Sequence, residues 1–513
     1  MKSWQNHNKY ERPILIAVLF IIQLSWLIIL FTNVINYSAW VNAFFIFISV
    51  MMILYLIRKN DSPAYRMSWI SLIAVFPLLG GLLYLLIGNK RPTKKMKSLI
   101  AQEDPHYVSA FRGLPHKLEG LMGTDKRVGA LANYLYQYEM MPVYSDTRIA
   151  YYPNGESMME TLLYDLKSAK KYIFIEFFIV DYGEMFEAIF TILREKVKEG
   201  VEVRFLYDDF GCLARLPKNF VEECEAMGIK ALKFNPVSPI LSMVYNTRDH
   251  RKFVIIDGEI GYTGGLNLAD EYINAVERFG YWKDNMVRIQ GAATWSITIL
   301  FLQIWNAFYS KKDGDYLQFL PPADQITSDD ASEGYVQPFG DSPLDNEAIG
   351  ENVYRNLLDM ATESVYIYTP YLVVSYELQT AIELASKRGV DVRLITPGIP
   401  DKRLVFRLTR SYYRPLIEAG ARIFEYRPGF VHAKTFIVDG KIACVGTINL
   451  DFRSLYLHFE NGVLMYYHPV VQQIEQDFLK TQEQSEEILL SSLSQSFYGE
   501  MLDSLLRLLA PFI

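Results

Sequence analysis

The residues with the clearest chemical potential in this chain form a pattern that occurs twice. The first copy reads His250-x-Lys252, then Asp257, then Gly264-Gly265-x-Asn267. The second copy reads His432-x-Lys434, then Asp439, then Gly446-Thr447-x-Asn449. Each residue lies 182 positions after its counterpart, as from 250 to 432. Because each of these types makes up only roughly 2–7% of an ordinary chain, two copies in register are not a coincidence.

The residue types in this pattern suit the chemistry of phosphodiesters. An imidazole near neutrality attacks phosphorus as a nucleophile or transfers a proton. The stretches 253–256 and 435–438 have β-strand character, and a His and a Lys two residues apart on a strand point to one face. Lysine, asparagine and threonine side chains donate hydrogen bonds to phosphate oxygens. We therefore expect the phosphate to be bound by Lys252, Lys434, Asn267 and Asn449, with Thr447 assisting.

The duplicated pattern resembles the signature of the phospholipase D superfamily, and the rest of the chain resembles the bacterial cardiolipin synthases within it. The resemblance covers nearly the whole chain, and its motifs are highly specific. The stretches that carry it, besides the two motifs, are 174–178, 281–284, 369–371, 430–434, 449–454, the hydrophobic N-terminus and the closing 505–511.

This resemblance implies an α/β fold with two phospholipase D-like α/β/α halves, one site at their pseudo-twofold interface, and N-terminal transmembrane helices before them. It implies that two phosphatidylglycerol molecules give cardiolipin and glycerol, through a phosphohistidine and without metal or other cofactor. We take His250 as the nucleophile and His432 as the general acid and base, although motif symmetry leaves the reverse order open. Asp257 and Asp439 belong to the signature, and we favour a structural role in the turn over direct proton transfer.

Each catalytic histidine also needs a carboxylate at its other ring nitrogen to fix the tautomer. The resemblance suggests Glu460 for one of them, eleven residues beyond Asn449. The matching position in the first half is Arg278, so Asp284 is the better candidate there.

Two other functions compete with the synthase. A membrane-bound phospholipase D or phosphodiesterase would use the same residues with water as the acceptor, and a phosphatidylethanolamine donor fits the same chemistry. A catalytically dead membrane scaffold is the alternative from another class, and the intact motifs argue against it. A related phosphatidylserine synthase does not explain the N-terminal apolar segments.

Composition narrows the class of protein further. Half of the 513 residues are hydrophobic and 14% are aromatic, which suits a membrane protein. The net charge of −7 argues against a nucleic-acid partner. The three cysteines have no metal-like spacing, and we interpret them as reduced thiols of a cytoplasmic domain.

Three apolar runs, about 13–31, 39–57 and 67–87, open the chain. The first two are long enough to span a bilayer, which needs roughly 20 residues. Basic residues flank this pair on both outer sides, which predicts a transmembrane hairpin at about 13–57 with both ends in the cytoplasm. The third run is followed by a basic cluster at 90–97, and its Pro77 predicts a bent, re-entrant or interfacial segment. In the alternative, the first run lies flat on the membrane and only the other two runs span it. Both arrangements predict a multi-pass protein of the bacterial cell membrane with a cytoplasmic catalytic region. The basic cluster suits a surface of anionic lipid.

The remaining chain divides into segments. We expect a membrane region at 1–97, a first half at 98–310, a linker at 311–344, and a second half with a C-terminal helix at 345–513. Strand–helix–strand order recurs at 172–179, 184–198 and 202–207, and again at 365–368, 375–388 and 391–395, and predicts a mostly parallel sheet in each half.

Four further features have weaker interpretations. Glu176 lies in an apolar strand and suits either the site or a structural ion pair. The basic stretch 402–414 is a solvated helix face or a surface for anionic headgroups. The tail from 485 is a packing helix, with membrane contact as the alternative. The histidines outside the motifs, His458 among them, are expected to be surface or structural residues.

Overall fold

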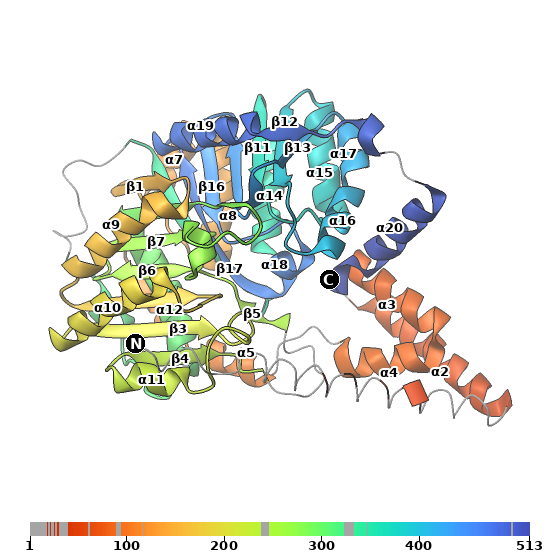
Figure 1. Ribbon diagram of the computed structural model, residues 1–513, viewed down its shortest axis with the longest axis horizontal. Coiled ribbons are helices and arrows are strands. Elements are labelled where there is room, and N and C mark those ends of the chain that lie inside the picture. Colours follow the sequence, from red (N-terminus) through yellow and green to blue (C-terminus); the bar gives the residue numbers. More distant parts are fainter. Residues whose placement is uncertain are drawn as a thin grey trace.

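The structure is a computed structural model, shown in Figure 1, that describes most of the chain. The described residues are 39–59, 62–88, 94–114, 116–237, 246–322, 333–345, 347–493 and 496–512, with Val18, Ile21, Ser25, Ile28 and Ile29. The predicted apolar run 13–31 therefore lies almost wholly outside them.

The first half is built on a seven-stranded sheet of order β1-β9-β7-β6-β2-β3-β4. Its strands are β1 (Thr147–Tyr152), β2 (Tyr172–Phe177), β3 (Glu202–Asp208), β4 (Lys230–Phe234), β6 (Phe253–Ile256), β7 (Ile260–Gly264) and β9 (Met286–Gly291). Its helices are α9 (Gly155–Ser168), α10 (Glu184–Lys198), α11 (Phe220–Ala226) and α12 (Thr294–Phe308). Strand β2 is buried on both faces, since Ile173 and Ile175 pack in the core with α9 and α10, and Phe174 packs in the core with α12.

The second half repeats this plan on a nine-stranded sheet. Eight of its strands follow the order β10-β17-β16-β15-β11-β12-β13-β18. They are β10 (Tyr335–Asp341), β11 (Ser364–Tyr368), β12 (Asp391–Pro397), β13 (Arg422–Tyr426), β15 (Thr435–Val438), β16 (Ile442–Gly446), β17 (His458–Tyr466) and β18 (Ser485–Glu487). The helices are α14 (Ile349–Met360), α15 (Tyr376–Lys387), α16 (Arg403–Ser411), α17 (Tyr413–Glu418), α18 (Phe452–Tyr456) and α19 (Val470–Glu483). The predicted units are confirmed as β2-α10-β3 and β11-α15-β12.

The prediction of mostly parallel sheets was wrong. Only β2-β3 and β3-β4 pair in parallel in the first sheet, and only β11-β12 and β12-β13 in the main path of the second. The motif strands cause the difference, because β6 and β7 form a hairpin, as do β15 and β16. Asp257-Gly258 and Asp439-Gly440 make these turns with positive φ, which is the conformation that Asp-Gly turns supply.

The segment predicted as a linker contains structure at its C-terminal end. Strand β10 lies within 311–344 and pairs with β17 at one end of the sheet order. Its Pro338 is tolerated because an end strand need not donate every backbone hydrogen bond. The helices before the first sheet are α5 (Lys94–Ala101), α6 (Asp104–Phe111), α7 (Leu118–Thr124) and α8 (Lys126–Glu139). The Gln337 side chain of β10 donates to Ala132 O in α8 at 3.0 Å, so this part of the predicted first half packs on the second.

From residue 39 onward, the described part of the N-terminal segment forms helices that lie beside the two sheet-containing halves (Figure 1). They are α2 (Ala39–Arg58), α3 (Pro63–Val75) and α4 (Pro77–Ile87). The third apolar run is bent at Phe76, as Pro77 predicts, and Gly80 lets α4 lie directly on the backbone of α3 at Leu72 and Ile73. Among the described residues, no helix combines the length and the apolar character needed to cross a membrane.

The C-terminal helix α20 (Phe497–Leu509) joins this segment to the second half. Ser68 Oγ in α3 donates to Leu508 O at 2.6 Å, and Trp69 meets the Phe512 ring with centroids 5.0 Å apart. On the other side, Arg407 of α16 pairs with Asp503 at 2.6 Å. The tail expected as a helix from 485 thus contains a helix that begins at Phe497, and it packs on both neighbours while Phe497, Tyr498 and Met501 are exposed.

Candidate active site

Two short strand pairs join the halves at the motifs. Strand β5 (Arg248–Asp249) of the first half pairs in parallel with the start of β17, and β14 (Gly429–Val431) of the second half pairs in parallel with β8 (Tyr281–Lys283). A motif histidine follows each short strand. His250 N donates to Phe459 O at 2.9 Å, and His432 N donates to Lys283 O at 2.7 Å. Each histidine is therefore held by the backbone of the opposite half.

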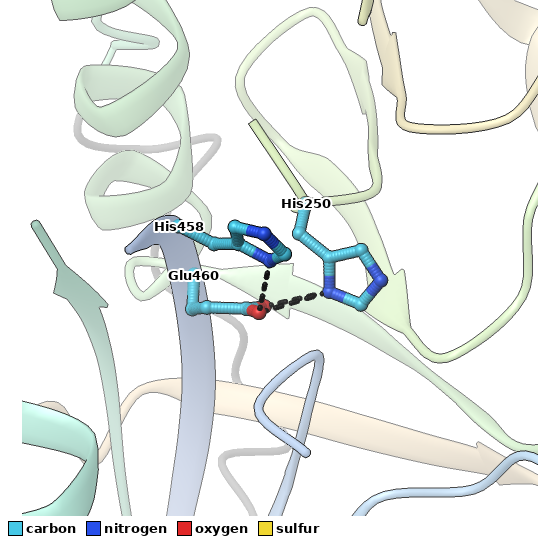
Figure 2. A group of neighbouring side chains, drawn as sticks. All are labelled: His250, His458 and Glu460. Carbon is cyan, nitrogen blue, oxygen red and sulfur yellow. Dashed lines mark hydrogen bonds and ion pairs between the residues drawn. The ribbon is translucent and has the colours of Figure 1, made fainter. Parts of the chain in front are cut away.

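The same strand pairing between the halves places each histidine next to a carboxylate of the other half. His250 Nδ1 lies 2.9 Å from Glu460 Oε1, and His432 Nδ1 lies 2.7 Å from Asp284 Oδ2. All four residues are buried, and Figure 2 shows the first pair. The sequence analysis proposed Glu460 and Asp284 as the orienting carboxylates without assigning each to a histidine. The structure pairs each carboxylate with the histidine of the other half. With Nδ1 engaged, Nε2 is the ring nitrogen left for chemistry.

The difference between the Gly-Gly and Gly-Thr turns follows from these carboxylates. A Cβ at Gly265 would lie 2.7 Å from Cγ of Asp284, so only glycine leaves room for that carboxylate. In the other half, the Thr447 hydroxyl donates to Glu460 and Asn461 N donates to Thr447 Oγ1 at 3.0 Å. Thr447, expected at the phosphate, thus supports the carboxylate of Glu460.

The motif lysines are buried beside the histidines, and each ammonium donates to the carbonyl of its own motif histidine, Lys252 to His250 and Lys434 to His432. Burial lowers the pKa of Lys252 to about 7 and that of Lys434 to about 8. An arriving phosphate anion would favour the charged forms.

Burial also sets the charge of the histidine–carboxylate pairs. Loss of hydration lowers the pKa of His250 and His432 below the ordinary value, although the facing carboxylates oppose that shift. Burial alone would raise the pKa of Glu460 and Asp284, but the facing imidazoles hold it below the ordinary value. The free enzyme therefore holds neutral imidazoles against ionised carboxylates, so that Nε2 carries the lone pair.

The two asparagines have different surroundings. Asn267 accepts from Ile179 N at 2.9 Å and donates to the Tyr272 hydroxyl at 2.8 Å, and the Tyr272 ring packs on His432. Asn449 is buried and its side-chain oxygen has no hydrogen-bond partner among the described residues. Asn267 therefore links the first motif to the second histidine.

The two aspartates of the signature lie away from the histidines. Asp257 is separated from Lys252 by the whole of β6, and it accepts from the backbone N–H groups of Lys170, Lys171 and Tyr172 at 2.7–2.8 Å. Asp439 accepts in the same way from Thr362, Glu363 and Ser364. Neither aspartate contacts a histidine, and each joins its hairpin turn to the start of the neighbouring strand.

Two weaker sequence features form ion pairs within the chain. Glu176 Oε1 lies 3.0 Å from Arg251 Nε, and the same Nε pairs with Asp249. The Glu176 carboxylate therefore belongs to a structural ion pair. In the basic stretch, Arg410 pairs with Glu425 at 3.1 Å and Arg407 with Asp503. These ion pairs compensate part of the basic charge, while the two arginine side chains remain 38–39% exposed. The cysteines are free and buried.

His458 is a site residue that the sequence analysis missed. It stands two residues before Glu460 on β17, so both side chains point to one face, and its Nδ1 lies 3.6 Å from Glu460 Oε1 (Figure 2). Its ring centroid is 5.6 Å from that of His250. The three side chains offer nitrogen and oxygen ligand atoms all within 4.8 Å of one another, which makes them a group able to hold a metal ion. The i, i+2 spacing was visible in the sequence, but not the arrival of His250 from the other half.

Comparison with known proteins places this arrangement in a family. The family model described as "Cardiolipin synthase, PLD-like domain" matches residues 162–294 and 354–481. These two matches cover both histidine motifs and both carboxylates. The chain belongs to the cardiolipin synthase family of the phospholipase D superfamily. It is accordingly a phosphatidyltransferase enzyme. The model described as "Phospholipase_D-nuclease N-terminal" matches residues 47–89.

Similar proteins match about nine-tenths of the chain. A cardiolipin synthase of Geobacillus sp. is 33% identical over 91% of this chain and 92% of its own length. An uncharacterized protein of Streptococcus mutans is 42% identical over 90% of this chain and 99% of its own. The crystal structure of the Haemophilus influenzae phosphatidylserine synthase aligns with a TM-score of 0.55 at 17% identity, over 75% of this chain and 98% of that one, which shows a common fold.

Proposed function

We propose that this enzyme makes cardiolipin and glycerol from two phosphatidylglycerol molecules. The observation that carries the proposal is the pair of buried imidazoles, each bonded at Nδ1 to a carboxylate of the other half. Relatives named cardiolipin synthase that match over most of this chain support the lipid substrates.

The reaction would proceed in two displacements. His432 first takes up a proton at Nε2, which the negative charge of the bound phosphate favours. Nε2 of His250 then attacks the phosphorus of one phosphatidylglycerol, the bond from phosphorus to the glycerol oxygen breaks, and His432 gives that proton to the oxygen as glycerol leaves. The terminal hydroxyl of a second phosphatidylglycerol then gives its proton to His432 and attacks the phosphorus, and the bond to His250 breaks. Lys252 and Lys434 stabilise the phosphate oxygens throughout. The imidazoles supply nucleophile, acid and base, so no step calls for a cofactor.

We further propose a multi-pass arrangement in the bacterial cell membrane. The predicted hairpin at 13–57 would anchor the chain with both ends in the cytoplasm, and α3 and α4 would lie bent at the membrane. Support comes from the exposed apolar side chains of α2, such as Phe44, Phe47 and Leu54, and from the basic cluster that follows the third run.

The first test incubates the purified protein with phosphatidylglycerol in detergent micelles and identifies the products by mass spectrometry. Cardiolipin with equimolar glycerol, lost in His250→Ala and His432→Ala and retained in a control variant of the exposed His116, His116→Ala, would support the transferase. Phosphatidic acid without cardiolipin would replace it with the hydrolase.

A second test assigns the two histidine roles. A phosphodiester that releases p-nitrophenol needs no protonation of its leaving group, so His432→Ala should give a burst of about one equivalent and a labelled His250. His250→Ala should give no burst. The opposite result would exchange the roles.

A further inference from the structure

One of the differences between the two half-sites adds a ligand to one of them. Trp282 stands two residues before Asp284, as His458 stands two residues before Glu460. The Trp282 ring lies 5.4 Å from that of His432, and the His458 ring lies 5.6 Å from that of His250. An indole N–H has no lone pair to donate, whereas an imidazole does. Only the His250 side therefore combines two imidazoles with a carboxylate.

The His458 imidazole has one long polar contact, to Glu460, which Figure 2 shows as a dashed line. Its side chain is only 10% exposed, and among the residues described neither ring nitrogen has a hydrogen-bond partner. Its Nδ1 is 3.6 Å from Glu460 Oε1, too long for a hydrogen bond. Buried polar groups are normally paired, and a lone exception calls for an explanation such as an absent ion.

The two distances from Glu460 to the imidazoles suit a small transition-metal ion, and all three ligand atoms lie within 4.8 Å of one another. Metal–ligand bonds of about 2.0–2.1 Å in a tetrahedral site put neighbouring ligand atoms roughly 3.3 Å apart. The distances from Glu460 Oε1 to His250 Nδ1 and to His458 Nδ1, 2.9 and 3.6 Å, lie on either side of that value. Two histidines and one glutamate are also a known zinc set with a fourth position open.

We propose that His250, His458 and Glu460 bind a divalent transition-metal ion such as Zn²⁺, and that the bound ion inhibits the enzyme. The inhibition rests on the proposed function, because the ion takes His250 Nδ1 and the carboxylate that together orient Nε2. Lys252 is an opposing feature, since its ammonium lies beside His250 and repels a dication. We therefore expect reversible binding with a Kd on the order of micromolar rather than the tight binding of structural zinc sites.

The binding experiment titrates the full-length protein in micelles with Co²⁺ and records its visible absorption. The wild type should show tetrahedral bands that saturate at one equivalent. His458→Phe, which keeps a ring against Phe178, should lose them, and His458→Gln provides a second variant if the first does not fold. His116→Gln, at an exposed histidine, should behave as the wild type. Equal bands in the wild type and the His458 variants would refute the site.

The inhibition experiment adds Zn²⁺ during cardiolipin synthesis and compares each variant with its own metal-free rate. The His458 variants should need at least tenfold more Zn²⁺ for half inhibition. Equal inhibition of all variants would mean that the ion acts on the anionic lipid, and would overturn the inhibitory role. Co²⁺ binding that depends on His458 in a protein without synthase activity would keep the site and reject the proposed function.

Discussion

Replacement of Gly265 by alanine should inactivate the enzyme by displacing one carboxylate. The alanine Cβ would lie 2.7 Å from Cγ of Asp284, whereas ordinary carbon contacts are about 3.5–4.0 Å, so the carboxylate must retreat by about 1 Å. Its 2.7 Å bond to His432 would lengthen to roughly 3.7 Å, which is no longer a hydrogen bond.

The expected loss in kcat is about 10²–10⁴-fold. Loss of the carboxylate that orients a catalytic histidine costs about 10⁴-fold in a serine protease triad, and displacement costs no more than removal. The range corresponds to about 2.7–5.4 kcal/mol of transition-state stabilisation. Stability should fall by about 1–3 kcal/mol from overpacking, which denaturant unfolding would measure separately.

The assay is the initial rate of cardiolipin formation by Gly265→Ala, Asp284→Asn and the double variant. If the glycine acts through Asp284, the double variant should lose little beyond Asp284→Asn alone. Gly314→Ala is the matched control, because a Cβ there meets nothing within 4 Å. A folded Gly265→Ala enzyme within threefold of the wild-type rate would refute the reasoning, as would fully additive losses.

Three other predictions follow from the site. The kcat/KM should fall in two steps as the pH rises through about 7 and about 8, because burial lowers the pKa of Lys252 to about 7 and that of Lys434 to about 8, and both charged forms are lost well before that of an ordinary lysine. Lys434→Arg should remove the second step, and a flat profile to pH 10 would contradict the role of the charge. Asp257→Ala should lower the free energy of unfolding by about 2–4 kcal/mol, because three backbone donors lose their acceptor. The kcat of the folded enzyme should stay within about threefold of wild type. A large loss of kcat at unchanged stability would instead support proton transfer by Asp257. Thr447→Val should lower kcat about tenfold by removing the donor to Glu460, with Thr447→Ser close to wild type, and equal rates for both variants would argue against that role.

Local patterns in the sequence predicted the repeated units well. The helix 184–198 was expected and found at those bounds, because its apolar spacing is a property of adjacent residues. The direction of the strands was predicted wrongly. The Asp-Gly turns after the motif strands indicate hairpins. These hairpins make the motif strands antiparallel, although the strand–helix–strand order of the other strands favours parallel pairing.

The pairing within the site depends on contacts between the halves, which spacing does not encode. The sequence indicated Asp284 and Glu460 one at a time. That each carboxylate faces the histidine of the other half follows from the pairs β5-β17 and β14-β8, which extend over only two and three residues. Such short strands carry no periodic signal. His458 was assigned to the surface or structure for the same reason, since its neighbour His250 is 208 residues away in the sequence, from 250 to 458.

The two exchanged strand pairs also bear on when during synthesis this enzyme gains its reactivity. A first half emerging alone from the ribosome would carry His250 without Glu460, and Asp284 without His432. A slip of one residue in either pair, about 3.3 Å, would part a histidine from its carboxylate. An incomplete or misdocked chain at the membrane would therefore lack an oriented nucleophile. If the proposed function holds, lipid is therefore not cleaved before the chain is complete.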